Sequence, residues 1–360
     1  MKYIPQIEPW LGKEEQNAVL SVLKSGWITE ARKTHEFEQM IANFVGSTYA
    51  CAVSNGTVSL FVALAALGVG KGDEVIVPDF TMVATPNAVL LAGAKPVFVD
   101  INKETLCLTI DAVEKKITPK TKAIIPVSLN GRSCDMNRLL QIAKEHNIFI
   151  IEDAAQAFGS YYDEKHLGTF GDIGSFSFST PKIITTGQGG ALVTNNKKLY
   201  EKMVRLKDFG RINRNSQDHD EIGYNFKFTD IQAAIGVEQM KKLPWRIERK
   251  KEMYRLYHRM LSDVKQIEFI PTYLTDVSPW FIDVMVPQPV TLQEFLHKKG
   301  IGTRLFYPAI HTTKPYKSQK LFPNSLWAAQ RGIWLPSSSI LSDTQIRFVC
   351  NQIKNFYGTD

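Results

Sequence analysis

The stretches IEDAAQAFGS (151–160) and SFSFSTPKIITTGQGG (175–190) carry the decisive pattern of this sequence. Each begins in a run typical of a buried strand and continues into small or hydroxyl-bearing residues. Asp153 ends the first strand, and Lys182 follows the second within a loop closed by glycines. A buried carboxylate requires a partner. A lysine in a partly desolvated pocket has a lowered pKa and can attack a carbonyl to form an imine.

Around these stretches, from about residue 48 to 195, short β-branched runs alternate with longer helical patterns. Strands at this interval, with helices between them, predict an α/β fold with a largely parallel sheet covered on both faces. Ligands of such sheets bind beyond the carboxyl ends of the strands. The runs expected as strands are CAVS (51–54), EVIVP (74–78), PVFVD (96–100), KAIIPV (122–127), FIIED (149–153), GSFSF (174–178) and GALVTN (190–195).

The last part of the chain has a different pattern. A long helical pattern runs from about Thr229 to Leu261, and we expect it to break near Pro244. A short strand at 281–286 and helices at 292–299 and 342–356 follow. We therefore place a domain boundary within the long helix. The division gives a large α/β domain, residues 1–245, and a smaller C-terminal α+β domain, residues 246–360.

Composition excludes several classes of protein. The 360 residues are 44% hydrophobic and 22% charged, as in ordinary globular proteins. No run of about twenty apolar residues predicts a membrane span, and the first residues lack the apolar stretch of a secretory signal, so we expect a cytoplasmic protein. The four scattered cysteines show no metal-type spacing and predict free thiols. The net charge of +7 is spread along the chain, and RIERKK (246–251) favours a solvated helix face over a nucleic-acid patch.

A third element lies upstream of the decisive stretches. SNGT (54–57) is a turn that opens a helix, and a helix N-terminus is a natural seat for a phosphate. A phosphate seat, a carboxylate for a ring nitrogen (Asp153) and an imine-forming amine (Lys182) are what pyridoxal 5′-phosphate (PLP) requires from a protein. Each alone has an ordinary alternative: an N-cap turn, a helix-capping acid and a surface lysine. Their order at successive strand ends favours a cofactor site.

The same residues resemble the DegT/StrS-type sugar aminotransferases, within the fold-type I group of PLP-dependent transferases, which have the aspartate aminotransferase-like fold. The resemblance covers essentially the whole chain. Besides the stretches already quoted, the matching segments are GWIT (26–29), GDEVIVP (72–78), GAKPVFVD (93–100), ITPKTKAIIPV (117–127), GTFGDIGSFSF (168–178), GYNFKFTDIQAAIG (223–236), TRLFYPAIH (303–311) and WLP (334–336).

The resemblance implies a role for each matching position. Lys182 would hold PLP as a Schiff base and move a proton, Asp153 would pair with the pyridine nitrogen, and Gln156 would bond the phenolic oxygen of the ring. The phosphate would be bound by four residues, the last of them from the partner subunit of a homodimer with a shared active site: Gly56, Thr57, Ser177 and Asn225. Three further residues would face the substrate, although each also has an ordinary structural interpretation: Trp27, Arg304 and His311.

Several positions depart from the family pattern. Gln188 replaces the usual glutamate of the glycine loop, and Met82 stands where an aromatic residue commonly stacks on the PLP ring. Lys227 replaces an arginine and lacks its bidentate fork. Asn130 stands where the family more often has tyrosine. These departures affect the recognition of donor and substrate, and none removes an essential catalytic group.

The implied activity is transfer of an amino group from L-glutamate to a nucleotide-linked deoxysugar, a step of polysaccharide or O-antigen biosynthesis. The members that look most similar aminate C4 of a GDP-linked 4-keto-6-deoxysugar. A 3-keto sugar, or one linked to dTDP or UDP, is the alternative. A sugar dehydratase of the same fold would carry histidine in place of Lys182. A non-catalytic regulatory protein of this fold would not need to retain the lysine, the acid and the phosphate seat. No nucleic-acid or membrane partner is expected.

Overall fold

The computed structural model describes residues 3–213 and 217–358. Its central element is a seven-stranded sheet in the order β1-β9-β8-β5-β4-β2-β3. Strand β9 is antiparallel to both of its neighbours, and the remaining pairs are parallel. The largely parallel sheet expected from the sequence is therefore confirmed. The strands are β1 (Tyr49–Val53), β2 (Glu74–Pro78), β3 (Lys95–Val99), β4 (Thr121–Ile124), β5 (Phe149–Asp153), β8 (Ile173–Ser177) and β9 (Gly190–Thr194).

Helices cover both faces of this sheet because its strands are apolar on both faces. Ile76 of β2 packs into one hydrophobic core, and its neighbours Val75 and Val77 pack into the other. One face is covered by α3 (Gly56–Ala66), α4 (Ala84–Leu91) and α7 (Lys197–Lys207). The other is covered by α2 (Arg32–Val45), α6 (Met136–His146) and the first half of α8 (Asp230–Leu261), with α5 (Ile110–Glu114) beside α6 and α1 (Lys13–Ser25) outside α8.

The expected break of the long helix at Pro244 is wrong, because α8 continues through the proline to Leu261. A proline inside a helix removes one backbone hydrogen bond and clashes with the preceding turn. Contacts with the rest of the chain hold the helix across this point. Leu243 is fully buried, and the buried Arg246 donates to the backbone carbonyls of Ile183 (2.9 Å) and Trp10 (2.8 Å). The solvated face expected for RIERKK is therefore wrong for Arg246 and for the buried Lys250.

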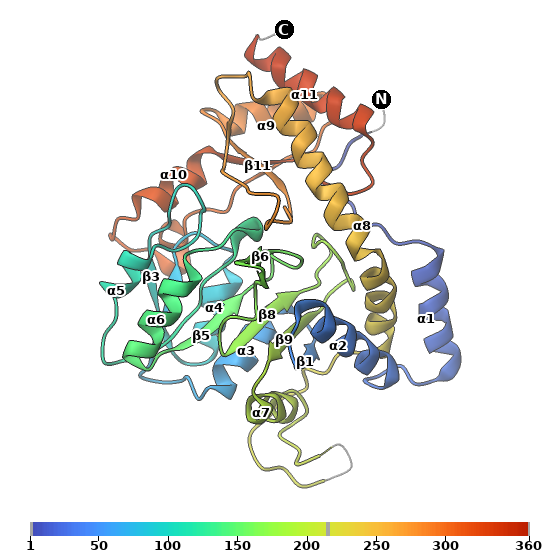
Figure 1. Ribbon diagram of the computed structural model, residues 1–360, viewed down its shortest axis with the longest axis vertical. Helices are drawn as coiled ribbons and strands as arrows, with labels where there is room; N and C mark the ends of the chain where they lie inside the picture. The colour runs from blue at the N-terminus through green and yellow to red at the C-terminus, as the bar shows by residue number, and fades with distance from the viewer. Residues whose placement is uncertain (1–2, 214–216, 359–360) are drawn as a thin grey trace.

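A second, antiparallel sheet follows, in the order β10-β11-β13-β12. Its core also receives the second half of α8 and Ile4, near the N-terminus, which forms a bridge with Ile301. In Figure 1, α9 and α11 lie at the top with both termini, and α8 connects this part to the region of α1 and α2. The domain boundary near residue 245 stays a prediction. The remaining strands and α-helices are β10 (Glu268–Phe269), β11 (Ile282–Met285), α9 (Pro289–Lys298), β12 (Arg304–Leu305), α10 (Pro323–Arg331), β13 (Gly332–Leu335), α11 (Asp343–Tyr357) and the small hairpin β6 (Tyr161–Tyr162) and β7 (Lys165–His166). Three short 3-10 helices within the described residues are η1 (Leu129–Gly131), η2 (Ile310–Thr312) and η3 (Lys314–Tyr316).

A buried ion pair joins the loop after β4 to the second sheet. The guanidinium of Arg132 contacts the carboxylate of Asp283 on β11, and both side chains are at most 3% exposed. Arg132 also donates to the carbonyl of Thr105 and to the hydroxyl of Thr272, both at 3.1 Å. Among the described helices, none has the length and apolar content needed to cross a bilayer.

Replacing Asp283 with alanine should destabilise the protein strongly, because it leaves the Arg132 charge buried without its carboxylate. The expected loss in the free energy of unfolding is about 3–5 kcal/mol, measured by urea denaturation. Arg138→Ala is the matched control. It breaks the pair with Glu114, in which both side chains are at least 39% exposed, and should cost less than about 1 kcal/mol. Equal effects of the two substitutions would contradict the importance of the buried pair.

Candidate active site

The candidate site is a pocket of about 320 Å³ at the carboxyl ends of β5 and β8, beside the N-terminus of α3. This is the edge of the sheet at which a ligand site was expected. Eight of the eleven residues expected at the site line this one pocket: Gly56, Thr57, Met82, Asp153, Gln156, Ser177, Lys182 and Arg304. Gln188 of the glycine loop lines it as well.

The N-terminus of α3 forms one wall. The side chain of Asn55 caps the helix by accepting the N–H of Val58 at 3.0 Å. The backbone N–H groups of Gly56 and Thr57 belong to the first turn, where the helix itself offers no acceptor. A Cβ atom at Gly56 would lie 2.8 Å from the Cβ of Ser177, so the close approach of α3 to β8 requires glycine. These donors and the Ser177 side chain make this wall suitable for an anion.

Asp153 supplies the acid of the site. It is only 5% exposed, and its carboxylate accepts from the Thr85 hydroxyl (2.8 Å) and from the N–H of Ala155 (3.3 Å). Burial raises the pKa of Asp153, and the bonds from Thr85 and Ala155 together with the charge of Lys182 offset only part of this rise. A cationic ligand group beside Asp153 would therefore stabilise its ionised form.

Lys182 supplies the amine. Burial lowers the pKa of Lys182 to about 8. The negative charge of Asp153 raises this pKa, and the positive charge of Arg304 lowers it. The Nζ atom lies 3.8 Å from the ring centroid of Trp280. A lysine with this pKa has a substantial neutral fraction near neutral pH and can act as a nucleophile or as a base.

Gln156 is held in one orientation. Its Oε1 accepts the backbone N–H of Asn130 at 3.0 Å. Because a backbone N–H can only donate, this bond identifies the oxygen of the amide. The NH2 group of Gln156 is then the part of the amide that remains for a ligand.

Three expected site residues lie outside the pocket of this chain. Trp27 is 72% exposed, and Asn225 is exposed on the segment that pairs with Asp208. His311 is buried, with its Nδ1 2.6 Å from a carboxylate oxygen of Asp79 and its backbone N–H bonded to the other at 2.9 Å. The structure gives His311 an acid partner in the interior and does not bring it to the pocket, so its substrate role stays a prediction.

Two residues that sequence reasoning missed complete the pocket. Trp280, just before β11, and Tyr307, just after β12, both line it and both belong to the second part of the chain. Tyr307 lies within the TRLFYPAIH segment, which was a signal for it. Trp280 stands in no motif, and only the packing of the second sheet against β5 and β8 reveals it.

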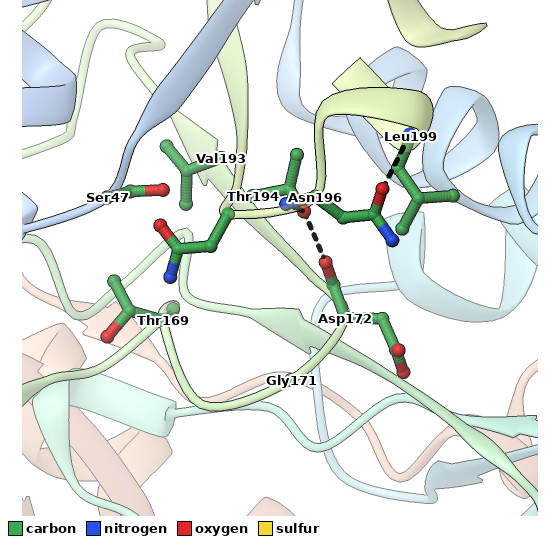
Figure 2. Close-up of a pocket in the computed structure, with 10 residues that line it drawn as sticks. Ser47, Thr169, Gly171, Asp172, Val193, Thr194, Asn196 and Leu199 are labelled. Carbon is green, nitrogen blue, oxygen red and sulfur yellow. Dashed lines mark hydrogen bonds between the residues drawn. The ribbon is translucent and has the colours of Figure 1, made fainter. Parts of the chain in front are cut away.

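A larger hollow of about 450 Å³ lies at the opposite edge of the sheet, around the start of β8 and the end of β9. Figure 2 shows Thr194 bonded to the carbonyl of Asp172, at 2.8 Å, and Asn196 bonded to the N-terminus of α7. The ten described residues that line it include no lysine, arginine or histidine. Its polar groups serve the local structure, so we do not regard it as the reaction site.

The sheet, the acid and the lysine fit one class of protein, the aminotransferases of the aspartate aminotransferase-like fold. A family model described as the DegT/DnrJ/EryC1/StrS aminotransferase family matches residues 9–354, and the chain belongs to this family. The family and the fold expected from the sequence are thereby confirmed.

Full-length relatives agree with this assignment. The chain is 42% identical to a protein of Escherichia coli O157:H7 named GDP-perosamine synthase, over 99% of this chain and 100% of that protein. It is 37% identical to a GDP-perosamine synthase of Vibrio cholerae, over 99% of both. Among solved structures, Spr1654 of Streptococcus pneumoniae in a PLP form is 29% identical, covers 99% of both chains and has a TM-score of 0.93.

The pKa of Lys182 can be tested directly in cofactor-free protein. Reductive methylation requires the neutral amine, so the rate of methylation of Lys182 should rise with pH. It should reach half of its maximum at a pH of about 8, the half-point. Asp153→Asn removes a charge that raises this pKa and should move the half-point to lower pH. Mass spectrometry of Lys182 over a pH series measures it, with exposed Lys198 in the same digest as a control for the reagent. A half-point at the ordinary value of 10.5 would show that the amine is not desolvated.

Proposed function

We propose that this aminotransferase moves an amino group from L-glutamate to C4 of a GDP-linked 4-keto-6-deoxysugar, with PLP held by Lys182. The observation that carries the proposal is that Lys182 and Asp153 line one pocket together with the N-terminus of α3. The two relatives named GDP-perosamine synthase, which align over their whole lengths, support the choice of nucleotide and sugar.

The residues present fit PLP. The first turn of α3 at Gly56, with Ser177, would hold the phosphate, Asp153 would pair with the ring nitrogen, and the NH2 group of Gln156 would face the phenolic oxygen. The raised pKa of Asp153 indicates a carboxylate that gains from a cationic partner. When bound, PLP supplies an aldehyde that condenses with an amine and a ring that withdraws electrons from the carbon being deprotonated.

Proton transfer would be carried out by Lys182. Its lowered pKa allows Nζ both to release and to take up a proton near neutral pH, as a general acid–base group must. The carboxylate of Asp153, which accepts from the Thr85 hydroxyl, would favour a protonated ring nitrogen when ionised. Hence the acid tunes the cofactor, and the lysine moves the proton.

Among the described residues that line the pocket, Arg304 is the one basic side chain besides Lys182. It lines the pocket, and its guanidinium lies 5.7 Å from the Tyr307 ring centroid and 5.5 Å from that of Trp334. An arginine oriented on aromatic rings suits the carboxylate of glutamate or the diphosphate of the nucleotide. Met82 is 44% exposed and lines the same pocket, at a position where the family commonly has an aromatic residue.

A homodimer with a shared active site is part of the proposal. The segment that carries Asn225 is flanked by exposed apolar side chains: Phe209 (40%), Ile212 (48%), Ile222 (82%) and Tyr224 (41%). Clustered apolar exposure of this kind marks an interaction surface. A partner that covers it would bring its Asn225 to the phosphate of this chain. We place the enzyme in the cytoplasm, where its four buried, free cysteines would stay reduced.

A substrate panel tests the proposed reaction. Protein loaded with PLP and treated with glutamate should lose its Schiff-base absorbance and regain it fastest with the GDP-linked 4-keto sugar. Lys182→Ala should abolish the absorbance band and turnover, whereas Lys198→Ala on the exposed face of α7 should change neither. Faster recovery with a dTDP- or UDP-linked sugar, or with a 3-keto sugar, would overturn the substrate while leaving the enzyme class intact.

Mixed dimers test the shared site. Lys182→Ala and Asn225→Ala should each be defective alone. Unfolding and refolding the two variants together should restore activity, because one of the two sites in a mixed dimer then has an intact Lys182 and the partner's intact Asn225. Activity measured before and after mixing decides the point, and the Lys182→Ala protein refolded alone is the control. No gain on mixing would contradict a site completed by the partner.

A further inference from the structure

Trp280 contacts the reacting amine. It lies in the loop before β11, is 4% exposed, and presents its ring to Lys182 Nζ at 3.8 Å from the centroid. A cation over an indole face is attracted by the electrons of the ring, and the attraction grows when water is excluded. The contact therefore favours the ammonium form of Lys182, against the effect of burial.

The position of Trp280 is fixed by two hydrogen bonds of its own and by two of the next residue. Its indole N–H donates to the carbonyl of Pro181, at 2.6 Å, and its own carbonyl accepts from the buried Lys250 at 2.8 Å. The side chain of Asn130 bonds both backbone groups of the next residue, Phe281, at 2.7 and 2.9 Å. The ring is thus held in place by backbone and side-chain bonds.

The charged groups facing Lys182 do not stabilise its ammonium form enough to offset burial. Asp153 raises the pKa of Lys182, but Arg304 lowers it and burial lowers it further. Tyr307 also lines the pocket, and burial raises its pKa, so its hydroxyl stays neutral. A lysine that has to both accept and release a proton needs a neighbour that stabilises its ammonium form only weakly. An uncharged group meets this requirement.

We propose that Trp280 is a catalytic residue whose indole face carries the protonated amine of Lys182, and that Asn130 is a positioning residue that holds Trp280 there. The proposal rests on the role proposed above for Lys182. Asn130 acts from two sides, because its backbone N–H fixes the Gln156 amide while its side chain holds Phe281. This gives a function to a position at which the chain departs from its family.

The test measures the pKa of Lys182 in cofactor-free protein by reductive methylation. Trp280→Leu removes the aromatic face and should lower this pKa by about one unit, whereas Trp280→Phe keeps a face and should stay within about 0.3 unit of the parent protein. Trp327→Leu is the matched control. It removes another indole that packs against a lysine, Lys103 at 5.1 Å, and should leave Lys182 unchanged.

Asn130→Gly provides a second variant in case Trp280→Leu does not fold. Asn130 has a left-handed backbone (φ 53°), which glycine adopts freely, and the N–H that bonds Gln156 is retained. The substitution releases Phe281 and should lower the pKa of Lys182 by about half a unit. Asn147→Gly, at an exposed left-handed position (φ 54°) after α6, is its control.

Kinetics of the loaded enzyme give a further readout. The half-reaction with glutamate should slow about tenfold in Trp280→Leu, with KM for the sugar nucleotide changed less than about twofold, and Trp280→Phe should restore most of the rate. An unchanged or raised pKa of Lys182 in both Trp280→Leu and Asn130→Gly would overturn this inference alone. Failure of Lys182 to bind PLP in the parent protein would instead overturn the proposed function.

Discussion

The candidate site depends on placing an acid and an amine, both buried, in one pocket. Burial raises the pKa of Asp153 and lowers that of Lys182, so each group departs from its ordinary value in the direction of its neutral form. Their mutual attraction opposes both shifts. The result is an acid that would gain from a cationic partner and an amine that can exchange a proton near neutral pH. Perturbed acid–base pairs of this kind are characteristic of reaction sites.

The two parts of the chain contribute differently to this pocket. The parallel sheet places Asp153 and Ser177 at one edge because parallel strands all end on the same side. The second part contributes aromatic and cationic side chains that close the pocket: Trp280, Arg304 and Tyr307. The buried pair between Arg132 and Asp283 links the loop after β4 to the second sheet.

Much of the fold could be predicted from local pattern. EVIVP and FIIED match β2 and β5 residue for residue, because short apolar runs bounded by polar residues specify buried strands. The long helix was expected to break at Pro244, and the prediction failed because Leu243 and Arg246 make contacts with distant residues that hold the helix across the proline. A local rule could not include those partners.

The sequence by itself determined the sheet, the family and the two groups to which the proposed chemistry is assigned. Each is encoded within a short segment: a strand that ends in an acid, a lysine in a glycine-closed loop, and a turn that opens a helix. Only the tertiary structure decided what surrounds them. Trp280 meets Lys182, and His311 meets Asp79, across 98 and 232 positions of the chain. Such contacts depend on how two hydrophobic cores pack together. The spacing of residues along the chain does not predict that packing.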